Sequence, residues 1–247
     1  MKRITTLLLS ISAFVTANHT IAKVPEASGI CYSQKSNTLF IANDEGSIFE
    51  LDTNGKILRE KKIGKYDLEG VACDDKNSDL IFAIEVDESI LVVNMKNLKV
   101  KKEIEIKRKY NDKMVIKKDK EHGIEAITIV DGDIYISNQS YKKYPYEDAS
   151  IVFKVGKLNK KKTKIKSIIA HDFVDIAGLS YHKDFLYMLS DKKNLLIKYD
   201  IKKDKAVKKV KLDKFAGEGV TFDNSGNIYF ADDEGSVLKY KISELGL

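Results

Sequence analysis

The 247-residue sequence has no tryptophan and only two prolines, and several motifs that mark enzyme classes are absent from it. It contains no Gly-x-Ser-x-Gly turn for a hydrolase serine, no glycine-rich phosphate loop, no His-Glu-x-x-His zinc pair and no Cys-x-x-Cys pair. These absences argue against the enzyme classes built on those motifs. Hydrophobic residues make up 43% of the chain, which is enough for a core and argues against disorder.

A long hydrophobic run is also lacking, because the apolar stretch ITTLLLSISAFV after Met1, Lys2 and Arg3 spans only about 12 residues. A membrane-spanning helix needs roughly 20. A basic start, a short apolar stretch and small residues after it are typical of a secretory signal. We predict a signal peptide over residues 1–17 and a mature domain over residues 18–247 in the periplasm or cell envelope. Cleavage after residue 22 and an uncleaved anchor are the alternatives.

The sequence does contain one motif that is repeated five times. The copies read EASGICYSQKSNTLFIANDEGS, LEGVACDDKNSDLIFAIEVDES, IEAITIVDGDIYISNQS, IAGLSYHKDFLYMLSDKKN and GEGVTFDNSGNIYFADDEGS. Their small-residue steps are 41, 56, 52 and 41 residues apart, close to the length of about 40 to 50 residues of a propeller blade. The repeat therefore predicts a β-propeller.

Each copy has the contents of a four-stranded blade, because two apolar runs joined by a polar turn are followed by two further strand-like runs. The fourth runs, such as VKKEIEI and AVKKVKL, alternate lysine with apolar residues, which is typical of an outer strand. The fifth copy lacks a fourth strand, and residues 19–24 would supply it and close the ring. We predict an all-β protein with a single propeller of five four-stranded blades, closed by an N-terminal strand. Six blades remain the alternative, although residues 107–122 contain no evident strand pair.

The two cysteines, Cys31 and Cys73, fall on neighbouring innermost strands of this arrangement. After export they would enter an oxidising compartment, where a disulfide can form. The sequence does not decide between a disulfide and two buried thiols, because bonding depends on distance and direction.

Acidic side chains gather at one predicted mouth of the channel, where the innermost strands begin and the second strands end. Five carboxylates in a narrow opening repel one another, so some hold a proton or a cation neutralises them. Every donor is a hard oxygen, which favours Ca²⁺, with Mg²⁺ as the second choice. The alternative is that these side chains cap backbone N–H groups or hold water. The predicted metal ligands are Glu69, Glu125, Glu218, Glu85, Asp232, Asn43 and Asn138, and the same columns also contain Ser28, Ala177 and Ser190.

The third copy carries an expanded loop at the same mouth, QSYKKYPYEDAS, with tyrosines and lysines suited to an anionic ligand. If the cation serves a hydrolase, His122 and Lys142 are the candidate catalytic residues. The alternative is a solvated insertion with no role. Lysines spread over outer strands, together with export, argue against nucleic-acid binding.

The phrases EASGICY, DLEGVAC, GIEAITI and GEGVTF, followed by IAND, AIEVDE, ISNQS and FADDEG, resemble the SdiA-regulated (YjiK-like) family of bacterial propeller proteins. The resemblance covers residues 24–240 and implies an envelope-located propeller. Related gluconolactonase-like and phytase-like groups imply a divalent cation at the channel mouth. Glu69, Glu125 and Glu218 match the acidic step of the repeat. Ser28 and Ala177 depart from it, so the ring of carboxylates is open on the Ala177 side.

We therefore expect an exported, non-catalytic monomer that binds calcium together with a small anionic ligand or an envelope protein, with peripheral membrane association as a further expectation. A metal-dependent hydrolase of a phosphoester or lactone is the alternative, and a purely structural scaffold is a third.

Overall fold

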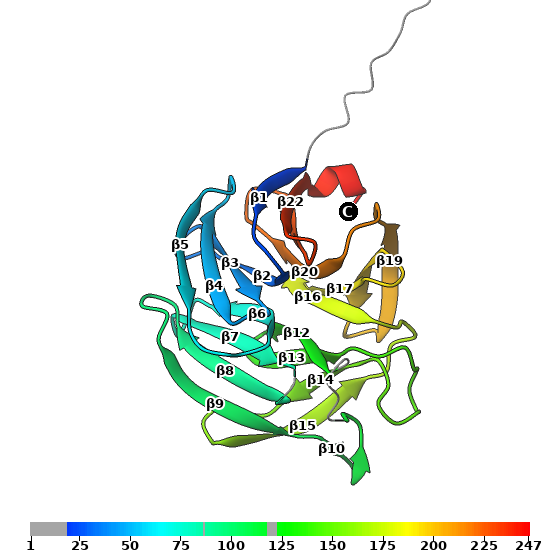
Figure 1. Cartoon of the computed structure of the whole chain (residues 1–247). Helices are drawn as coiled ribbons and strands as arrows, with labels where there is room; N and C mark the ends of the chain where they lie inside the picture. Colours follow the sequence, from blue (N-terminus) through cyan, green and yellow to red (C-terminus); the bar gives the residue numbers. More distant parts are fainter. Residues whose placement is uncertain (1–18, 86, 118–122) are drawn as a thin grey trace, which may run out of the picture.

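The computed structural model describes residues 19–85, 87–117 and 123–247, and this part of the chain is built almost entirely of β-strands. The predicted signal peptide lies outside the described residues. The strands form mainly antiparallel sheets arranged around a central axis, as in a propeller (Figure 1). Five innermost strands pack side by side in a ring, and the last of them returns to the first. They are β2 (Ala27–Ser33), β6 (Leu68–Asp74), β12 (Ile124–Val130), β16 (Ile176–His182) and β20 (Gly217–Phe222). The all-β, propeller-like architecture predicted from the repeat is confirmed.

The first two groups of strands follow the predicted runs closely. β3 at Thr38–Asn43, for example, is the predicted TLFIAN run. The first sheet contains β2 (Ala27–Ser33), β3 (Thr38–Asn43), β4 (Ser47–Asp52) and β5 (Ile57–Lys62). The second group contains β6 (Leu68–Asp74), β7 (Asp79–Ile84), β8 (Ser89–Asn94) and β9 (Val100–Lys107).

The other three groups repeat this order from the axis outward. The third contains β12 (Ile124–Val130), β13 (Asp133–Asn138), β14 (Ile151–Val155) and β15 (Lys162–Ile169). The fourth contains β16 (Ile176–His182), β17 (Phe185–Ser190), β18 (Leu195–Asp200) and β19 (Lys205–Lys211). The last contains β20 (Gly217–Phe222), β21 (Asn227–Asp232), β22 (Ser236–Lys241) and, from the N-terminus, β1 (Thr20–Lys23).

β1 occupies the outer edge of the last sheet, where it pairs antiparallel with β22 (Figure 1). Ala22 lies opposite Val237, and the backbone N–H of Lys239 donates to the carbonyl of His19 at 2.8 Å. After β22 the chain ends in a short 3₁₀ helix over Ile242–Leu245 instead of a strand. Cleavage after residue 22 would remove most of β1, whereas cleavage after residue 17 would retain it; the cleavage site stays a prediction.

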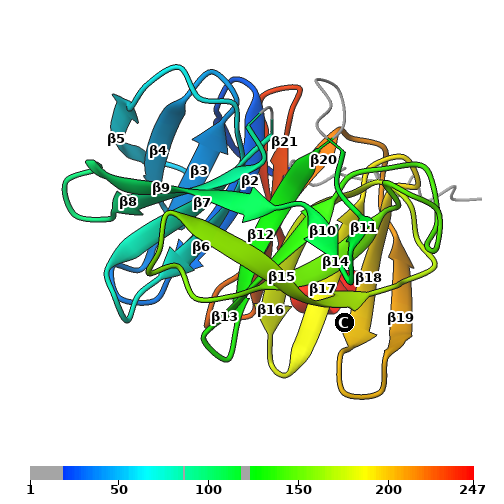
Figure 2. The same ribbon diagram turned by 90° about the horizontal axis from the view of Figure 1, so that it is seen from below.

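Residues 107–117 differ from the prediction in one detail, because they contain a two-stranded hairpin. It pairs β10 (Lys109–Tyr110) with β11 (Lys113–Met114). Two-residue strands lack the length and alternation that identify a strand in a sequence. Nearby, the outer strands β9 and β15 pair in parallel and join two groups into one eight-stranded sheet (Figure 2).

The core lies between neighbouring sheets, where their apolar faces meet. Phe40 of the first sheet and Phe82 of the second are both fully buried in one such cluster. Complete burial of a side chain of this size contributes about 1.5–3 kcal/mol. The cluster ends at the channel in a disulfide between Cys31 and Cys73, whose Cα atoms are 5.7 Å apart. The structure thus selects the disulfide from the two alternatives.

Candidate functional site

A β-bulge occurs at the same step of every innermost strand. In β2, Ala27 lies opposite Asn43 and Gly29 opposite Ala42, so Ser28 is an extra residue with no counterpart across the ladder. In β20 the same shift makes Glu218 the extra residue. The register of β6, β12 and β16 also shifts at this step. A bulge bends the strand and changes the direction of a side chain. The extra residue in each repeat therefore departs from the regular alternation of side chains along the strand.

The bulged acids come together at the mouth of the channel. Burial raises the pKa of Glu69 well above its ordinary range, and the negative charges of Glu85 and Glu218 raise it further. The pKa of Glu125 is raised in the same way, by burial and then by the charges of Glu69 and Glu218. Every charged group that shifts these two pKa values is another acid. The structure therefore brings together four predicted ligands: Glu69, Glu85, Glu125 and Glu218.

One close group of three carboxylates includes a residue that sequence reasoning missed. One oxygen from each of Asp67, Glu69 and Glu85 lies within 4.8 Å of the other two. Asp67 stands one residue before β6, and burial raises the pKa of its carboxyl. Three carboxylate oxygens at this spacing can ligate one hard cation.

Further acids face the same mouth from the ends of the second strands and from the turns before the first strands. Burial raises the pKa of Asp44 to about 7, and a hydrogen bond with Glu26 adds to the shift. The pKa of Glu218 rises to about 8, first through burial and then through the charges of Asp191 and Asp233. The missed acids of the mouth are Asp44, Asp67, Asp175, Asp191 and Asp233.

Three oxygens in this group are buried without a hydrogen-bond partner among the described residues. They are Oδ1 of Asp44, Oδ1 of Asp175 and Oε2 of Glu218. The other oxygen of Asp175 accepts a hydrogen bond from the backbone N–H of Lys192 at 2.6 Å. Buried polar atoms in native structures are normally hydrogen-bonded, so these lone pairs are available to a ligand.

The predicted ligands at the ends of the second strands hold loops together. Asn43 donates its side-chain N–H to the carbonyl of Pro25 at 2.8 Å, and Asn138 donates to that of Ala149 at 3.0 Å. Asp232 accepts a hydrogen bond from the backbone N–H of Glu234 at 3.1 Å. The Asp232 contact matches the alternative in which these side chains cap backbone N–H groups, whereas the two asparagines bind backbone carbonyls instead. A metal role for these three residues stays a prediction.

The expanded loop of the third repeat reaches the mouth through Tyr141. The negative charge of Asp175 is the largest cause of a raised pKa at Tyr141. The Lys192 ammonium lies 5.3 Å from the centre of the Tyr141 ring. Lys142 is exposed beside it, and His122 lies outside the described residues.

Taken together, the fold and the site define an all-β, propeller-like protein with a strongly acidic opening at one end of its axis. The sequence matches the SdiA-regulated family over residues 8–237, and the chain belongs to this family. No curated protein matches it significantly. Among the described residues, none of the helical segments is long and apolar enough to cross a membrane.

Solved structures similar to this chain have different sequences. The crystal structure of a glutaminyl cyclase from Myxococcus xanthus matches with a TM-score of 0.60 and 10% identity, over 90% of this chain and 92% of that chain. The β-propeller domain of Cps50 (Swd1) from Myceliophteria thermophila matches with a TM-score of 0.48 and 8% identity, over 89% of this chain and 66% of that chain. At 10% identity, the match to the glutaminyl cyclase shows a similar fold and nothing further.

Proposed function

We propose that the chain is an exported five-bladed propeller, closed by β1 against β22, that binds Ca²⁺ at its acidic mouth. The bound ion and the loop around Tyr141 then hold a small anionic ligand or an envelope protein, without catalysing a reaction. The observation that carries this proposal is the group of three carboxylates, Asp67, Glu69 and Glu85, whose oxygens lie within 4.8 Å of one another.

Electrostatics supports a cation at this position. Each of these carboxyls has neighbours of its own sign, which favour the protonated form in the metal-free protein, and the raised pKa of Glu69 reflects this repulsion. A divalent cation would replace those protons and favour the ionised carboxylates. The unpartnered oxygen of Glu218 offers a further donor on another strand of the ring.

The donor set favours calcium over magnesium. Ca²⁺ takes six to eight oxygen ligands with flexible geometry, whereas Mg²⁺ demands a near-ideal octahedron and retains several waters. Oxygens that come from separate strands meet the first requirement more easily than the second. Acids also lie on the Ala177 side, at Asp175 and Asp191, so the ring of carboxylates is not open there, contrary to the prediction from the sequence. Tyr141 and Lys192 stand beside these acids, where an anionic ligand could approach the ion.

A thermal-melting experiment with a matched control tests the cation site. Addition of Ca²⁺ to EDTA-treated protein should raise the Tm, because a ligand at 100 times its Kd stabilises by about 2.7 kcal/mol. That corresponds to roughly 5–10 °C for a domain of this size. Glu69→Gln should lose this response, whereas Glu60→Gln, an exposed acid on β5, should keep it. An equal Tm with and without Ca²⁺ in the wild type would rule out the site.

The same protein samples can be used to test the hydrolase alternative. Metal-loaded protein is incubated with p-nitrophenyl phosphate and with a simple γ-lactone, and the proposal expects no turnover. Turnover by the wild type that disappears in Glu125→Gln would show that the protein is a metal-dependent hydrolase and would contradict the proposed non-catalytic function.

A further inference from the structure

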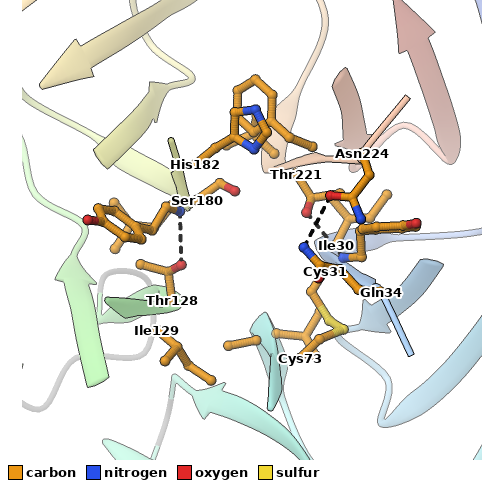
Figure 3. Close-up of a pocket in the computed structure, with 17 residues that line it drawn as sticks. Ile30, Cys31, Gln34, Cys73, Thr128, Ile129, Ser180, His182, Thr221 and Asn224 are labelled. Atoms are coloured by element: carbon orange, nitrogen blue, oxygen red, sulfur yellow. Dashed lines mark hydrogen bonds between the residues drawn. A yellow bond between two sulfur atoms is a disulfide. The ribbon is translucent and has the colours of Figure 1, made fainter. Parts of the chain in front are cut away.

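The end of the channel opposite the acidic mouth contains a pocket of about 150 Å³ (Figure 3). Its walls are the last residues of the innermost strands, such as Thr221 and Phe222 of β20, whereas Glu218 near the start of β20 belongs to the acidic mouth. Thr221 follows Glu218 by three residues, which corresponds to roughly 10 Å along the strand. The two sites therefore share one channel and are separate in space.

This pocket has no charged residue in its lining. Charged residues make up 32% of the sequence, yet none of the 17 residues that line the pocket is Asp, Glu, Lys or Arg. A charged ligand buried here would lose its hydration and find no counter-charge, which is costly. The pocket is therefore suited to an uncharged ligand.

Hydroxyl groups stand on opposite sides of the pocket in fixed orientations. Thr128 accepts a hydrogen bond from the backbone N–H of Tyr181 at 3.2 Å, and Thr221 accepts one from that of Tyr32 at 3.1 Å. A hydroxyl oxygen that accepts still has its own hydrogen to donate. Figure 3 shows both threonines at the edge of the open centre, with Ser180 as a third hydroxyl residue. The strand backbone thus holds these hydroxyls in place.

An amide pair and an aromatic wall complete the lining. Gln34 donates through Nε2 to Oδ1 of Asn224 at 3.1 Å, which leaves the N–H groups of Asn224 to donate elsewhere (Figure 3). His182 stacks on Phe222 with ring centroids 4.5 Å apart and ring planes 11° from parallel. Burial lowers the pKa of His182 to about 4, so this wall is uncharged at neutral pH. Flat apolar surface beside oriented donors is suited to a ring that carries hydroxyls.

We propose that this pocket binds an uncharged, hydroxyl-rich molecule of the size of one sugar ring. A cavity of about 150 Å³ accommodates a six-membered ring, because an engineered protein cavity of that volume binds benzene. The polar lining distinguishes this pocket from such an apolar cavity and selects hydroxyls over a hydrocarbon. Ligand binding here is independent of the cation at the other mouth.

Binding is tested by saturation-transfer NMR and calorimetry on the mature chain with glucose, N-acetylglucosamine and myo-inositol. Glucuronate and glucosamine serve as charged counterparts of the glucose ring. We expect saturation transfer to at least one neutral ring, and at least tenfold weaker binding of the charged sugars. Binding of none of the three neutral rings, or equal binding of glucuronate and glucose, would overturn the proposal.

Two variants locate the site. Asn224 is exposed at the rim, so Asn224→Leu should fold normally and weaken binding at least tenfold. Ser180→Val fills part of the pocket and should do the same, whereas Asn54→Leu, an exposed asparagine in a remote turn, should leave binding unchanged. Unaltered binding in both pocket variants would place the ligand elsewhere and refute the assignment. Glu69→Gln should retain sugar binding while it loses the Ca²⁺ response, so the two proposals fail separately.

Discussion

Gly29 lies against the peptide group of Glu69 so closely that a β-carbon on Gly29 would stand 2.4 Å from the Glu69 carbonyl oxygen. The next pair in the ring repeats this contact, because a β-carbon on Gly70 would stand 2.6 Å from the carbonyl oxygen of Glu125. The repeated small-residue step therefore has two consequences. The bulged residue faces the channel mouth, and the glycine after it lets the neighbouring inner strand approach.

Gly70→Ala should destabilise the fold because the new methyl group meets backbone atoms that cannot move independently. Overpacking of this kind costs about 1–3 kcal/mol. The corresponding fall in Tm is roughly 2–12 °C for a domain of this size. Gly156→Ala is the matched control, since the nearest atom to its β-carbon is the flexible end of Lys166. Equal Tm values for the two variants would contradict the close approach.

Strand positions could be predicted from the sequence because polar turns bracket each apolar run. The predicted runs TLFIAN and NIYFAD correspond to β3 and β21 without a shift at either end. The propeller-like architecture followed from the repeat, and family membership followed from the phrases that carry it. The number of blades and the closing role of β1 stay predictions, which the pairing of β1 with β22 supports.

The full acidic mouth could not be predicted, because the bulge is invisible in the sequence. A ladder without a bulge places the acid at the start of the first strand beside the last residue of the second. One extra residue shifts this relationship by one position. Asp44, Asp191 and Asp233 each follow the last residue of a second strand, and the shift brings them to the mouth. The sequence did contain a signal for these acids, because each of them follows the last residue of a predicted second strand at the same position of the repeat.

The disulfide should contribute substantially to stability because it joins two innermost strands across a sequence separation of 42 residues. The loop-closure relation gives about 4 kcal/mol for a loop of this length. We expect the double variant Cys31→Ala, Cys73→Ala to melt roughly 8–16 °C lower. Dithiothreitol should lower the Tm of the wild type toward that of the variant and leave the variant unchanged. If dithiothreitol leaves the Tm of the wild type unchanged, the disulfide adds no stability.

The metal-free protein should become less stable as the pH rises from about 4.5 to 8. Glu218 has its pKa raised from an ordinary value of 4.5 to about 8 in the folded state. The folded state therefore holds more protons than the unfolded state over this range, and stability falls with increasing pH. Melting curves in EDTA between pH 5 and pH 8 measure this slope.

Two comparisons establish the origin of that slope. Glu218→Gln removes one of the titrating groups and should reduce the loss of stability with pH, whereas Glu60→Gln should not. Addition of Ca²⁺ should stabilise the protein more at pH 8 than at pH 5, because the ion competes with protons for the same carboxylates. The same pH dependence in the wild type and in Glu218→Gln would contradict the raised pKa of Glu218.

The position of signal cleavage should decide whether the last sheet is complete. A chain that begins at Asn18 retains β1, whereas a chain that begins at Lys23 loses the pairing partner of β22 and the contact of Ile21 with the core. The lost hydrogen bonds and burial amount to about 3 kcal/mol. The shorter chain should therefore melt roughly 6–12 °C lower. Because its exposed β22 edge is a template for pairing with another chain, it should also self-associate in size-exclusion chromatography. Identical melting and elution of the two chains would exclude a structural role for β1, and cleavage after residue 22 would then be compatible with the fold.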